Sequence, residues 1–206
     1  MPPESVSDTN GDERAAPEPD APEPDAPEPV APEPVAPEPD DKDWTWTLTR
    51  VCPECGFDAA GIERVAIPAL IRDAISRFPE VLARPDATER PTPQTWSALE
   101  YACHVRDVCR VFTERLELMQ REDHPHFANW NQDATALEQR YGRQDPQVVS
   151  GELAASGEAV AVAFTHVRND EWERDGSRSN GSEFTVESLG RYFLHELFHH
   201  VWDLKG

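Results

Sequence analysis

The stretch YFLHELFHHV, residues 192–201, holds the residue types that bind metal ions. His195 and His199 are four residues apart, which on a helix places two imidazoles on one face about 6 Å apart. That spacing suits two ligands of one divalent ion, and imidazole favours Zn, Ni, Cu or Fe(II). We therefore predict a metal site that contains both histidines, with Zn or Ni as the expected ion. The alternative that the spacing leaves open is a pair of core histidines with ordinary hydrogen-bond partners.

The same residues match the H-E-x-x-H pattern of zinc proteases, with Glu196 after the first histidine. Proteases of this type usually take their third ligand from a segment downstream of the pair. Only seven residues follow His199, which leaves no room for that segment. The protease interpretation is therefore excluded, and a third ligand must come from upstream.

His104 is the best upstream candidate for the third ligand. It lies on the apolar stripe of a predicted helix, together with Val108 and Phe112, and this stripe should face the core. A buried imidazole without a partner is costly, so a histidine there needs a ligand or a hydrogen bond. His104, His195 and His199 are the predicted metal ligands. Three imidazoles leave a coordination position open, which is the pattern of a catalytic zinc site.

Two further residues of the same stretch lie beside this site. Glu196 is one residue from His195, about 100° round the helix. We predict that it is the catalytic residue, as a general base or as a hydrogen-bond partner behind the ligands, and a solvated surface carboxylate is the alternative. For His200 we expect packing or a supporting hydrogen bond rather than ligation.

Cys52 and Cys55 form a C-x-x-C pair followed by Gly56, which is half of a zinc knuckle. The second C-x-x-C that would complete the knuckle is missing. Three interpretations remain open: a structural zinc site completed by a histidine or carboxylate, a redox pair, and two thiols packed in a tight turn. Cys103 and Cys109 belong to a predicted helix and are expected to be small buried apolar residues.

Four helices should carry these residues. Apolar side chains recur at helical spacing in residues 68–83, 98–122, 147–167 and 186–204. The predicted starting signals are a capping box at Ser97, the cap Asp145 before Pro146, and the cap Thr185. Pro79 should kink or divide the first helix.

The segments between these helices have their own signals. Residues 44–50 alternate large and polar side chains, which favours a short strand or an extended lead-in. The connection 123–144 is long for a helix-to-helix loop, which is typical of a functional segment. A short hairpin is predicted around Asn180-Gly181.

This pattern predicts an all-α fold, a four-helix bundle formed by residues 44–206. Residues 1–43 are expected to be a separate disordered tail, because proline-rich APEPx pentads prevent helix and sheet formation and offer little to bury. We expect the tail to be a solubilising spacer, with a docking arm for a basic partner as the alternative.

The charge is strongly acidic, with a formal net charge of −21. Residues 1–43 hold 14 of the 40 acidic side chains and 2 of the 19 basic ones, yet the rest is still acidic and shows no basic stripe. We therefore expect no nucleic-acid partner. No stretch reaches the length of a membrane helix and no secretory leader is visible, so we expect no membrane and a cytoplasmic location. Four cysteines are then thiols or metal ligands rather than disulfides.

Four segments of the chain resemble the DinB/YfiT-like superfamily: WSALEYACHVRDV, FANWNQDA, RYGRQDP and FTVESLGRYFLHELFHHVWDL. The resemblance spans residues 44–204, and CPECGFDA is similar to the actinobacterial branch of GC-rich Gram-positive bacteria. It implies an up-down-down-up four-helix bundle. It also implies a metal held by one histidine of the second helix and the H-x-x-x-H pair of the fourth, which here are His104, His195 and His199.

The resemblance also implies enzymatic activity, but it specifies the reaction less closely than the fold and the ligands. Relatives include thiol S-transferases such as mycothiol-dependent maleylpyruvate isomerase, and metal-dependent hydrolases. We therefore expect a divalent-metal-dependent transferase that joins a low-molecular-weight thiol, mycothiol or a similar one, to an electrophilic small molecule. The alternatives are a metal-dependent hydrolase and a non-catalytic metal-binding stress-response or interaction module. Bundles of this kind often pair, so a homodimer is compatible with the sequence.

Overall fold

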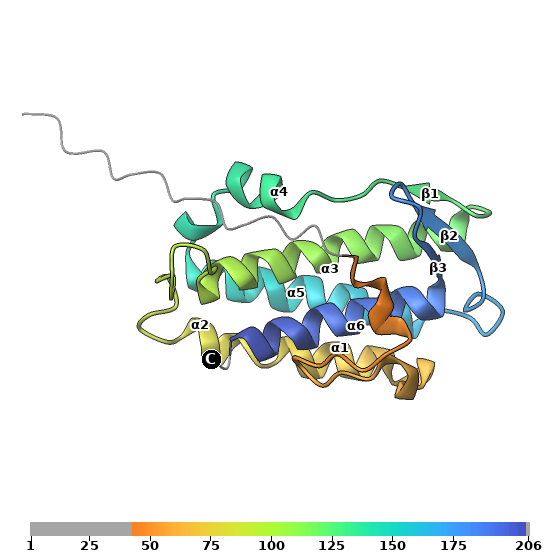
Figure 1. The fold of residues 1–206 in the computed structure, drawn as a ribbon, viewed down its shortest axis with the longest axis horizontal. Coiled ribbons are helices and arrows are strands. Elements are labelled where there is room, and N and C mark those ends of the chain that lie inside the picture. Colours follow the sequence, from red (N-terminus) through yellow and green to blue (C-terminus); the bar gives the residue numbers. More distant parts are fainter. Residues whose placement is uncertain (1–42, 205–206) are drawn as a thin grey trace, which may run out of the picture. The chain divides into compact units, whose positions relative to one another are not determined.

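The fold is known from a computed structural model, which describes residues 43–204. The predicted disordered tail lies outside the described residues, apart from Asp43. Within them the chain forms a four-helix bundle with a small sheet at one end (Figure 1). The predicted all-α bundle is confirmed, with this sheet as an addition.

Four long segments build the bundle. They are α1 (Ile67–Ile75) with its continuation α2 (Phe78–Leu82), α3 (Ala98–Arg121), α5 (Pro146–Thr165) and α6 (Val186–Asp203). In Figure 1, α3 and α5 run in one direction and α1 and α6 in the other, the predicted up-down-down-up arrangement. Both α3 and α1 pack against α5 and α6, so α6 is flanked by α1 and α3.

The predicted helix starts are confirmed in atomic detail. The Ser97 hydroxyl accepts a hydrogen bond from the Glu100 amide, and the Glu100 carboxylate accepts one from the Ser97 amide. Asp145 caps α5 and Thr185 caps α6 in the same manner, which satisfies amides that the first helical turn leaves without partners. The first helix is interrupted after Ile75, and α2 begins one residue before Pro79.

The long connection between α3 and α5 explains why these two helices are parallel. It contains β1 (His126–Phe127) and α4 (Gln132–Glu138), and it returns along the bundle to the end where α3 began (Figure 1). Strand β1 pairs in parallel with β2 (Asp175–Arg178), which pairs antiparallel with β3 (Glu183–Thr185). The β2–β3 turn at Asn180-Gly181 is the predicted hairpin, and Gly181 has a φ of +90°.

The segment before the bundle differs from the sequence-based expectation. Residues Trp44–Leu48 form a short 3-10 helix, η1, instead of a strand. Its backbone bonds are local: the Asp43 carboxylate accepts from the Thr45 amide, and the Thr47 hydroxyl donates to the Trp44 carbonyl. Such side-chain bonds offer the backbone an alternative to strand pairing. Two further 3-10 turns, Ala59–Gly61 and Arg64–Ala66, also lie against α6.

The bundle is tightest where α1, α5 and α6 meet. A Cβ added at Gly190 of α6 would lie 2.9 Å from both Ile67 Cδ1 and Phe164 Cε1. Glycine at this position therefore allows the three helices to approach one another. One turn along, the Phe193 ring stacks on Phe112 of α3 with ring centroids 4.8 Å apart. These contacts hold α6 in place along its buried side.

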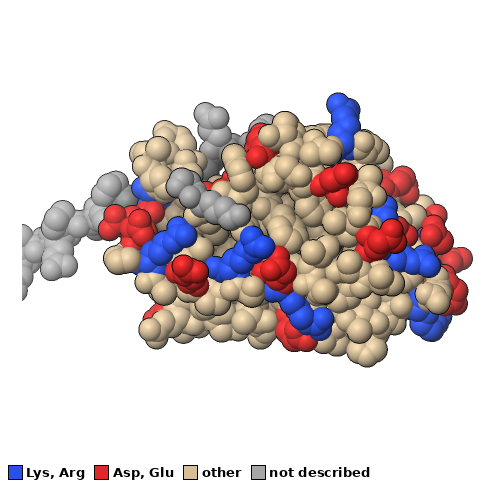
Figure 2. All heavy atoms as spheres, turned by 90° about the horizontal axis from the view of Figure 1, so that it is seen from below, with Lys and Arg blue, Asp and Glu red and all other residues tan. Residues whose placement is uncertain are grey.

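The surface carries both signs of charge. Acidic and basic side chains are interspersed on the face shown in Figure 2, without a basic stripe. Among the described helices, α5 is long and apolar enough to cross a membrane by length and composition, but its inner face packs against α1 and α3 as part of the bundle. The absence of a nucleic-acid partner and the cytoplasmic location stay predictions.

Candidate metal centres

Helix α6 presents two neighbouring rows of polar side chains. One row contains Tyr192, Glu196 and His200, and the other contains His195 and His199. Members of a row are four residues apart and stack on one face, while the rows differ by one residue and hence by about 100°. Each row meets a different segment of the chain, so each belongs to a different cluster of potential ligands.

The first cluster, here called the pocket centre, consists of His104, Glu196 and His200. Glu196 Oε1 lies 3.0 Å from His104 Nε2 and 3.3 Å from His200 Nε2. Tetrahedral ligands of one zinc ion are about 3.3–3.6 Å apart when their bonds are about 2.0–2.2 Å long, and the two observed distances are close to that spacing. Two imidazoles and a carboxylate at these distances fit a catalytic divalent ion, and they leave a coordination position open.

The side chains around the pocket centre fix its orientation. His200 Nδ1 lies 2.9 Å from Asp203 Oδ2, so His200 can present its Nε2 to the pocket centre. A carboxylate behind a ligating histidine is a recurrent feature of metal sites. The Trp130 ring stacks on His104 with centroids 5.5 Å apart, and Trp96 lies 5.2 Å from the same ring. The His104 side chain is thereby enclosed, and its Nδ1 has no hydrogen-bond partner.

The electrostatics of this cluster set the protonation state of each potential ligand. Burial alone would raise the pKa of Glu196, but hydrogen bonds from His104 and His200 hold it well below its ordinary value. Burial lowers the pKa of His104 despite its bond to Glu196. For His200 burial acts downward, and the bonds to Asp203 and Glu196 prevail and raise the pKa to about 9. At neutral pH the carboxylate is ionised and His104 is neutral, which are the forms that bind metal ions, whereas His200 is protonated and must release its proton when an ion binds.

A cavity of about 1030 Å³ opens beside the pocket centre. Its wall combines residues of α6 and α3 with aromatic residues from the connections, and includes Trp44, Trp96, Tyr101, Trp130, Arg115, Arg178, Tyr192, Glu196 and His200. Tyr192 of α6 and Trp130 of the connection after α3 both line this cavity. A space of this size holds a small organic molecule.

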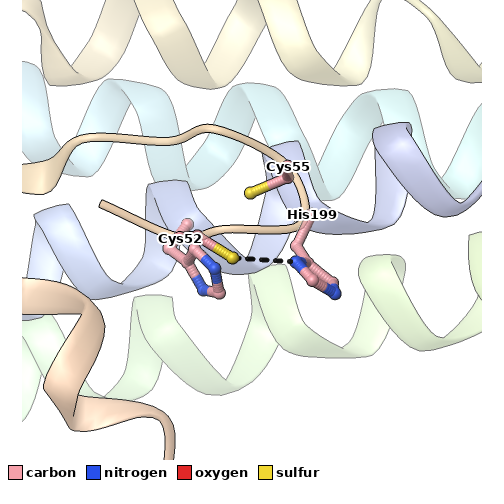
Figure 3. Close-up of side chains that lie close together, drawn as sticks. Cys52, Cys55 and His199 are labelled. Carbon is pink, nitrogen blue, oxygen red and sulfur yellow. Dashed lines mark hydrogen bonds between the residues drawn. The ribbon is translucent and has the colours of Figure 1, made fainter. Parts of the chain in front are cut away.

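The second cluster, here called the cysteine centre, consists of Cys52, Cys55, His195 and His199. One ligand atom from each lies within 4.8 Å of all the others. Figure 3 shows the Cys52 thiol directed at the His199 ring, with Cys55 on the same loop. The Cys52 Sγ to His199 Nδ1 distance is 3.8 Å. Two thiols and two imidazoles are a common ligand set of structural zinc sites, so this donor set also fits a metal ion.

Burial also shapes the titration of the cysteine centre. It lowers the pKa of His195 to about 4, with a further contribution from His199, so His195 is neutral at physiological pH. Burial raises the pKa of Cys55 to about 11. The other ring nitrogen of His199, Nε2, lies 3.4 Å from Glu54 Oε2. A carboxylate in this place can orient a ligating histidine.

The predicted ligands are thus divided between the two clusters. His195 and His199 lie together, as predicted, but their neighbours are the two cysteines. His104 belongs to the other group, where Glu196 Oε1 is within hydrogen-bond distance of both His104 and His200, and the catalytic role of Glu196 stays a prediction. His200, for which ligation was not expected, completes that group. Within the described residues, the single three-histidine set is therefore replaced by two groups, each of which needs both α6 and another segment.

A signal for this division was present in the sequence. H-E-L-F-H-H contains two overlapping pairs at i, i+4 spacing, His195/His199 and Glu196/His200. The C-x-x-C pair needs two more ligands to form a zinc site, and one of the two pairs could supply them. The sequence analysis did not consider that the candidate ligands form two groups of neighbouring side chains.

Other polar candidates have structural roles. Cys103 and Cys109 are fully buried in α3, as expected. Arg106 of α3 is buried and donates hydrogen bonds to the carboxylates of Asp107 and Glu152.

Comparison with known proteins supports the fold. The family model of the DinB superfamily matches residues 70–204. Among solved structures, YfiT from Bacillus subtilis, described as a probable metal-dependent hydrolase with an unusual four-helix bundle topology, aligns with a TM-score of 0.61. The alignment has 14% identity and covers 69% of this chain and 85% of that chain, a likeness that concerns the fold. No curated protein matches the sequence.

The family match includes all three residues of the pocket centre and excludes Cys52 and Cys55, which lie before residue 70. It extends over most of the folded part and through the whole of α3, α5 and α6. The chain therefore belongs to the DinB superfamily.

Proposed function

We propose that this protein is a metal-dependent hydrolase that acts on a small molecule with an anionic group. The observation that carries the proposal is the convergence of His104 Nε2, Glu196 Oε1 and His200 Nε2 beside a cavity of about 1030 Å³. The description of YfiT as a probable metal-dependent hydrolase supports the same class of activity for a protein of this fold.

Each side chain of the pocket centre has a separate role in the proposed reaction. His104 and His200 would hold the ion through Nε2 and Glu196 through Oε1, while the bond from Asp203 to Nδ1 would orient His200. A divalent ion bound there supplies Lewis acidity and lowers the pKa of a water molecule, which is the chemistry of hydrolysis at neutral pH. The enclosing rings of Trp96 and Trp130 keep bulk water away from His104 and strengthen the electrostatic interactions of the centre.

Two arginines of the cavity wall favour an anionic substrate. Arg115 and Arg178 are buried. Arg115 donates a hydrogen bond to the Ala128 carbonyl, and Arg178 donates to the uncharged side chains of Asn180 and Ser182. Burial lowers the pKa of Arg115 to about 10, helped by the positive charge of Arg178, so Arg115 remains cationic at neutral pH. A carboxylate or phosphate of the substrate would compensate these charges.

Tyr101 adds a hydrogen-bond donor to the cavity. Burial raises the pKa of its phenol to about 12, with further contributions from Asp203 and Glu100. The hydroxyl therefore keeps its proton at neutral pH. It can donate to a developing negative charge on the substrate.

A transferase that uses a low-molecular-weight thiol, such as mycothiol, is the second candidate. The size of the cavity favours it, since the volume accommodates a thiol cofactor beside an electrophile. No cysteine belongs to the described wall of the cavity, so the thiol would have to be supplied by a cofactor. In that case the ion would bind and activate the thiol instead of water.

The test uses tag-free full-length protein loaded with Zn, Ni, Mn or Fe(II) and a panel of esters and amides. Each substrate is assayed in a neutral and a carboxylate-bearing form, with and without added thiol. We expect hydrolysis of the acidic form without thiol, and loss of turnover in Glu196→Gln. Arg115→Gln should raise KM for the acidic substrate and leave the neutral one unchanged.

Two results would overturn the hydrolase proposal. Substrate consumption that requires thiol, with the thiol joined to the product, would establish the transferase. Unchanged hydrolysis in Glu196→Gln would remove the pocket centre from the reaction. Arg110→Gln is the matched control for Arg115→Gln, because Arg110 lies on the same helix, is half-exposed and is outside the cavity.

A further inference from the structure

We propose that Cys52, Cys55, His195 and His199 bind a second, structural zinc ion that fastens the segment before the bundle to α6. This ion would be distinct from the one at the pocket centre. The proposal rests on the geometry of the cysteine centre alone and does not depend on the reaction at the pocket centre.

The ligand set is complete without solvent. Zinc bonds of about 2.3 Å to sulfur and 2.0–2.1 Å to nitrogen place two tetrahedral ligands about 3.6 Å apart. The observed distance between Cys52 Sγ and His199 Nδ1 is 3.8 Å, and all four ligand atoms lie within 4.8 Å of one another. Four protein ligands fill a tetrahedron, which is the pattern of a structural site and contrasts with the three ligands of the pocket centre.

His195 gives independent support for a metal ion. Its side chain is almost fully buried, and both ring nitrogens lack a hydrogen-bond partner. A buried imidazole with two unsatisfied nitrogens is unfavourable, and burial of this kind calls for an explanation. A zinc ion between the thiols and His199 would satisfy one of them. A disulfide between Cys52 and Cys55 would leave both unsatisfied, so the redox-pair interpretation explains less.

The loop that carries the thiols has the form of a zinc knuckle. The Gly56 amide donates to the Cys52 carbonyl at 2.9 Å, and the Cys52 amide donates to the Phe57 carbonyl at 2.9 Å. Gly56 has a φ of +74°, which side chains rarely adopt, so glycine lets the chain turn back after Cys55. This turn holds two thiols of C-x-x-C spacing on one side, toward α6 (Figure 3).

A zinc ion here would also shape the cavity. The Trp44 ring lies 5.6 Å from His195 and 5.2 Å from His199, and Trp44 lines the cavity. The cysteine pair precedes the residues that match the family model, so this anchor is an addition to the DinB bundle. We infer that the ion holds residues 44–57 in place and thereby completes one wall of the substrate site.

The experiment replaces zinc with Co(II) in the full-length protein. Thiolate-bound tetrahedral Co(II) has a sulfur-to-metal charge-transfer band and intense visible bands, which a centre of two histidines and a carboxylate lacks. We expect the wild type to show this band and Cys52→Ser/Cys55→Ser to lose it. Glu196→Gln should retain the band while losing its other ion, and Cys109→Ala, which removes a buried thiol elsewhere, should be unchanged.

The wild-type spectrum tests the proposal without any substitution, so a misfolded variant would not leave it open. Absence of the charge-transfer band in the Co(II)-loaded wild type would overturn the proposal, as would its persistence in the double serine variant. Limited proteolysis gives a second readout. We expect cleavage within residues 44–57 to accelerate at least tenfold after removal of zinc, and cleavage at an unchanged rate would contradict the anchoring role.

Discussion

The two rows of potential ligands on α6 contain similar residue types but contact different segments of the chain. His195 and His199 meet two thiols from the loop before the bundle, whereas Glu196 and His200 meet one histidine of α3, and all four side chains line the large cavity. A one-residue offset along the helix thus separates a four-ligand set with sulfur from a three-ligand set without it. The number and softness of the ligands indicate which centre has a position left for substrate.

The comparison also explains the role of the segment before the bundle. The pocket centre is built entirely from residues within the family match, and the cysteine centre requires residues outside it. We interpret the first as the working site of the superfamily fold and the second as an anchor that this chain adds. Each of the following predictions separates the two centres by a different measurement.

The largest effect is expected for Glu196→Gln, which removes the carboxylate between two imidazoles. Loss of several kcal/mol of transition-state stabilisation would lower kcat/KM by about a thousandfold or more. The metal content should fall by one ion per chain while the cysteine centre stays loaded. Steady-state kinetics together with metal analysis checks this, and an active variant with full metal content would refute our assignment of Glu196.

The next largest effect concerns stability. Zinc that is about a thousandfold above its Kd stabilises the folded state by about 4 kcal/mol, which corresponds to roughly 8–16 °C in Tm for a protein of this size. A strong chelator should lower the wild-type Tm by about this amount. The Cys52→Ser/Cys55→Ser variant should start lower and lose less, since only the ion at the pocket centre remains to be removed. Equal chelator sensitivity of the two proteins in calorimetry would show that the thiols do not hold the stabilising ion.

Asp203→Asn should affect the two centres unequally. Asp203 Oδ2 is 2.9 Å from His200 Nδ1, whereas Asp203 Oδ1 is 3.9 Å from His199 Nε2. The nearer carboxylate to His199 Nε2 is that of Glu54, at 3.4 Å. Loss of an orienting carboxylate lowers metal affinity by about 10–100-fold, so we expect that loss at the pocket centre. A chelator-competition titration measures both sites, and equal weakening would contradict the inequality.

The smallest effect involves an ion pair one turn before His104 in α3. Arg90 donates to the Glu100 carboxylate, and these bonds together with the Ser97 amide prevail over burial and lower the pKa of Glu100. A depressed folded-state pKa contributes stability above the unfolded pKa of 4.5, and this contribution is lost as the pH falls through the folded pKa. Glu100→Gln should cost about 1–2 kcal/mol at neutral pH.

Denaturant unfolding of the wild type and Glu100→Gln across pH 3–7 checks this sign. The stability difference should shrink below pH 4.5, whereas both metal centres should keep their ions at neutral pH. A difference that grows as the pH falls would contradict the depressed pKa.

The helices were predictable because their signals are local. Ser97 with Glu100, Asp145 with Pro146, and Thr185 each mark a start within a few residues of the chain, and the structure has all three. Residues 44–48 were less predictable, since alternation of large and polar side chains also occurs in a 3-10 turn held by side-chain bonds. The path of the connection 123–144 depends on pairing between β1 and β2, which are far apart in the sequence.

The site was predictable in its residue types and not in its grouping. The i, i+4 spacing correctly indicated that His195 and His199 share a face of α6. Their partners were not visible, because Cys52 and His199 are 147 positions apart and meet only after the bundle has folded. The position of α3 relative to α6 likewise decides that His104 faces Glu196 instead of His195.

The central claim is that one helix serves two metal centres with separate ligands. Native mass spectrometry of tag-free full-length protein, loaded with zinc, tests it most directly. We predict two ions per chain in the wild type, one in Glu196→Gln/His200→Ala and one in Cys52→Ser/Cys55→Ser. A single ion in the wild type that is unaffected by the Glu196→Gln/His200→Ala substitutions and lost in both His104→Ala and His199→Ala would contradict the claim and support a three-histidine site.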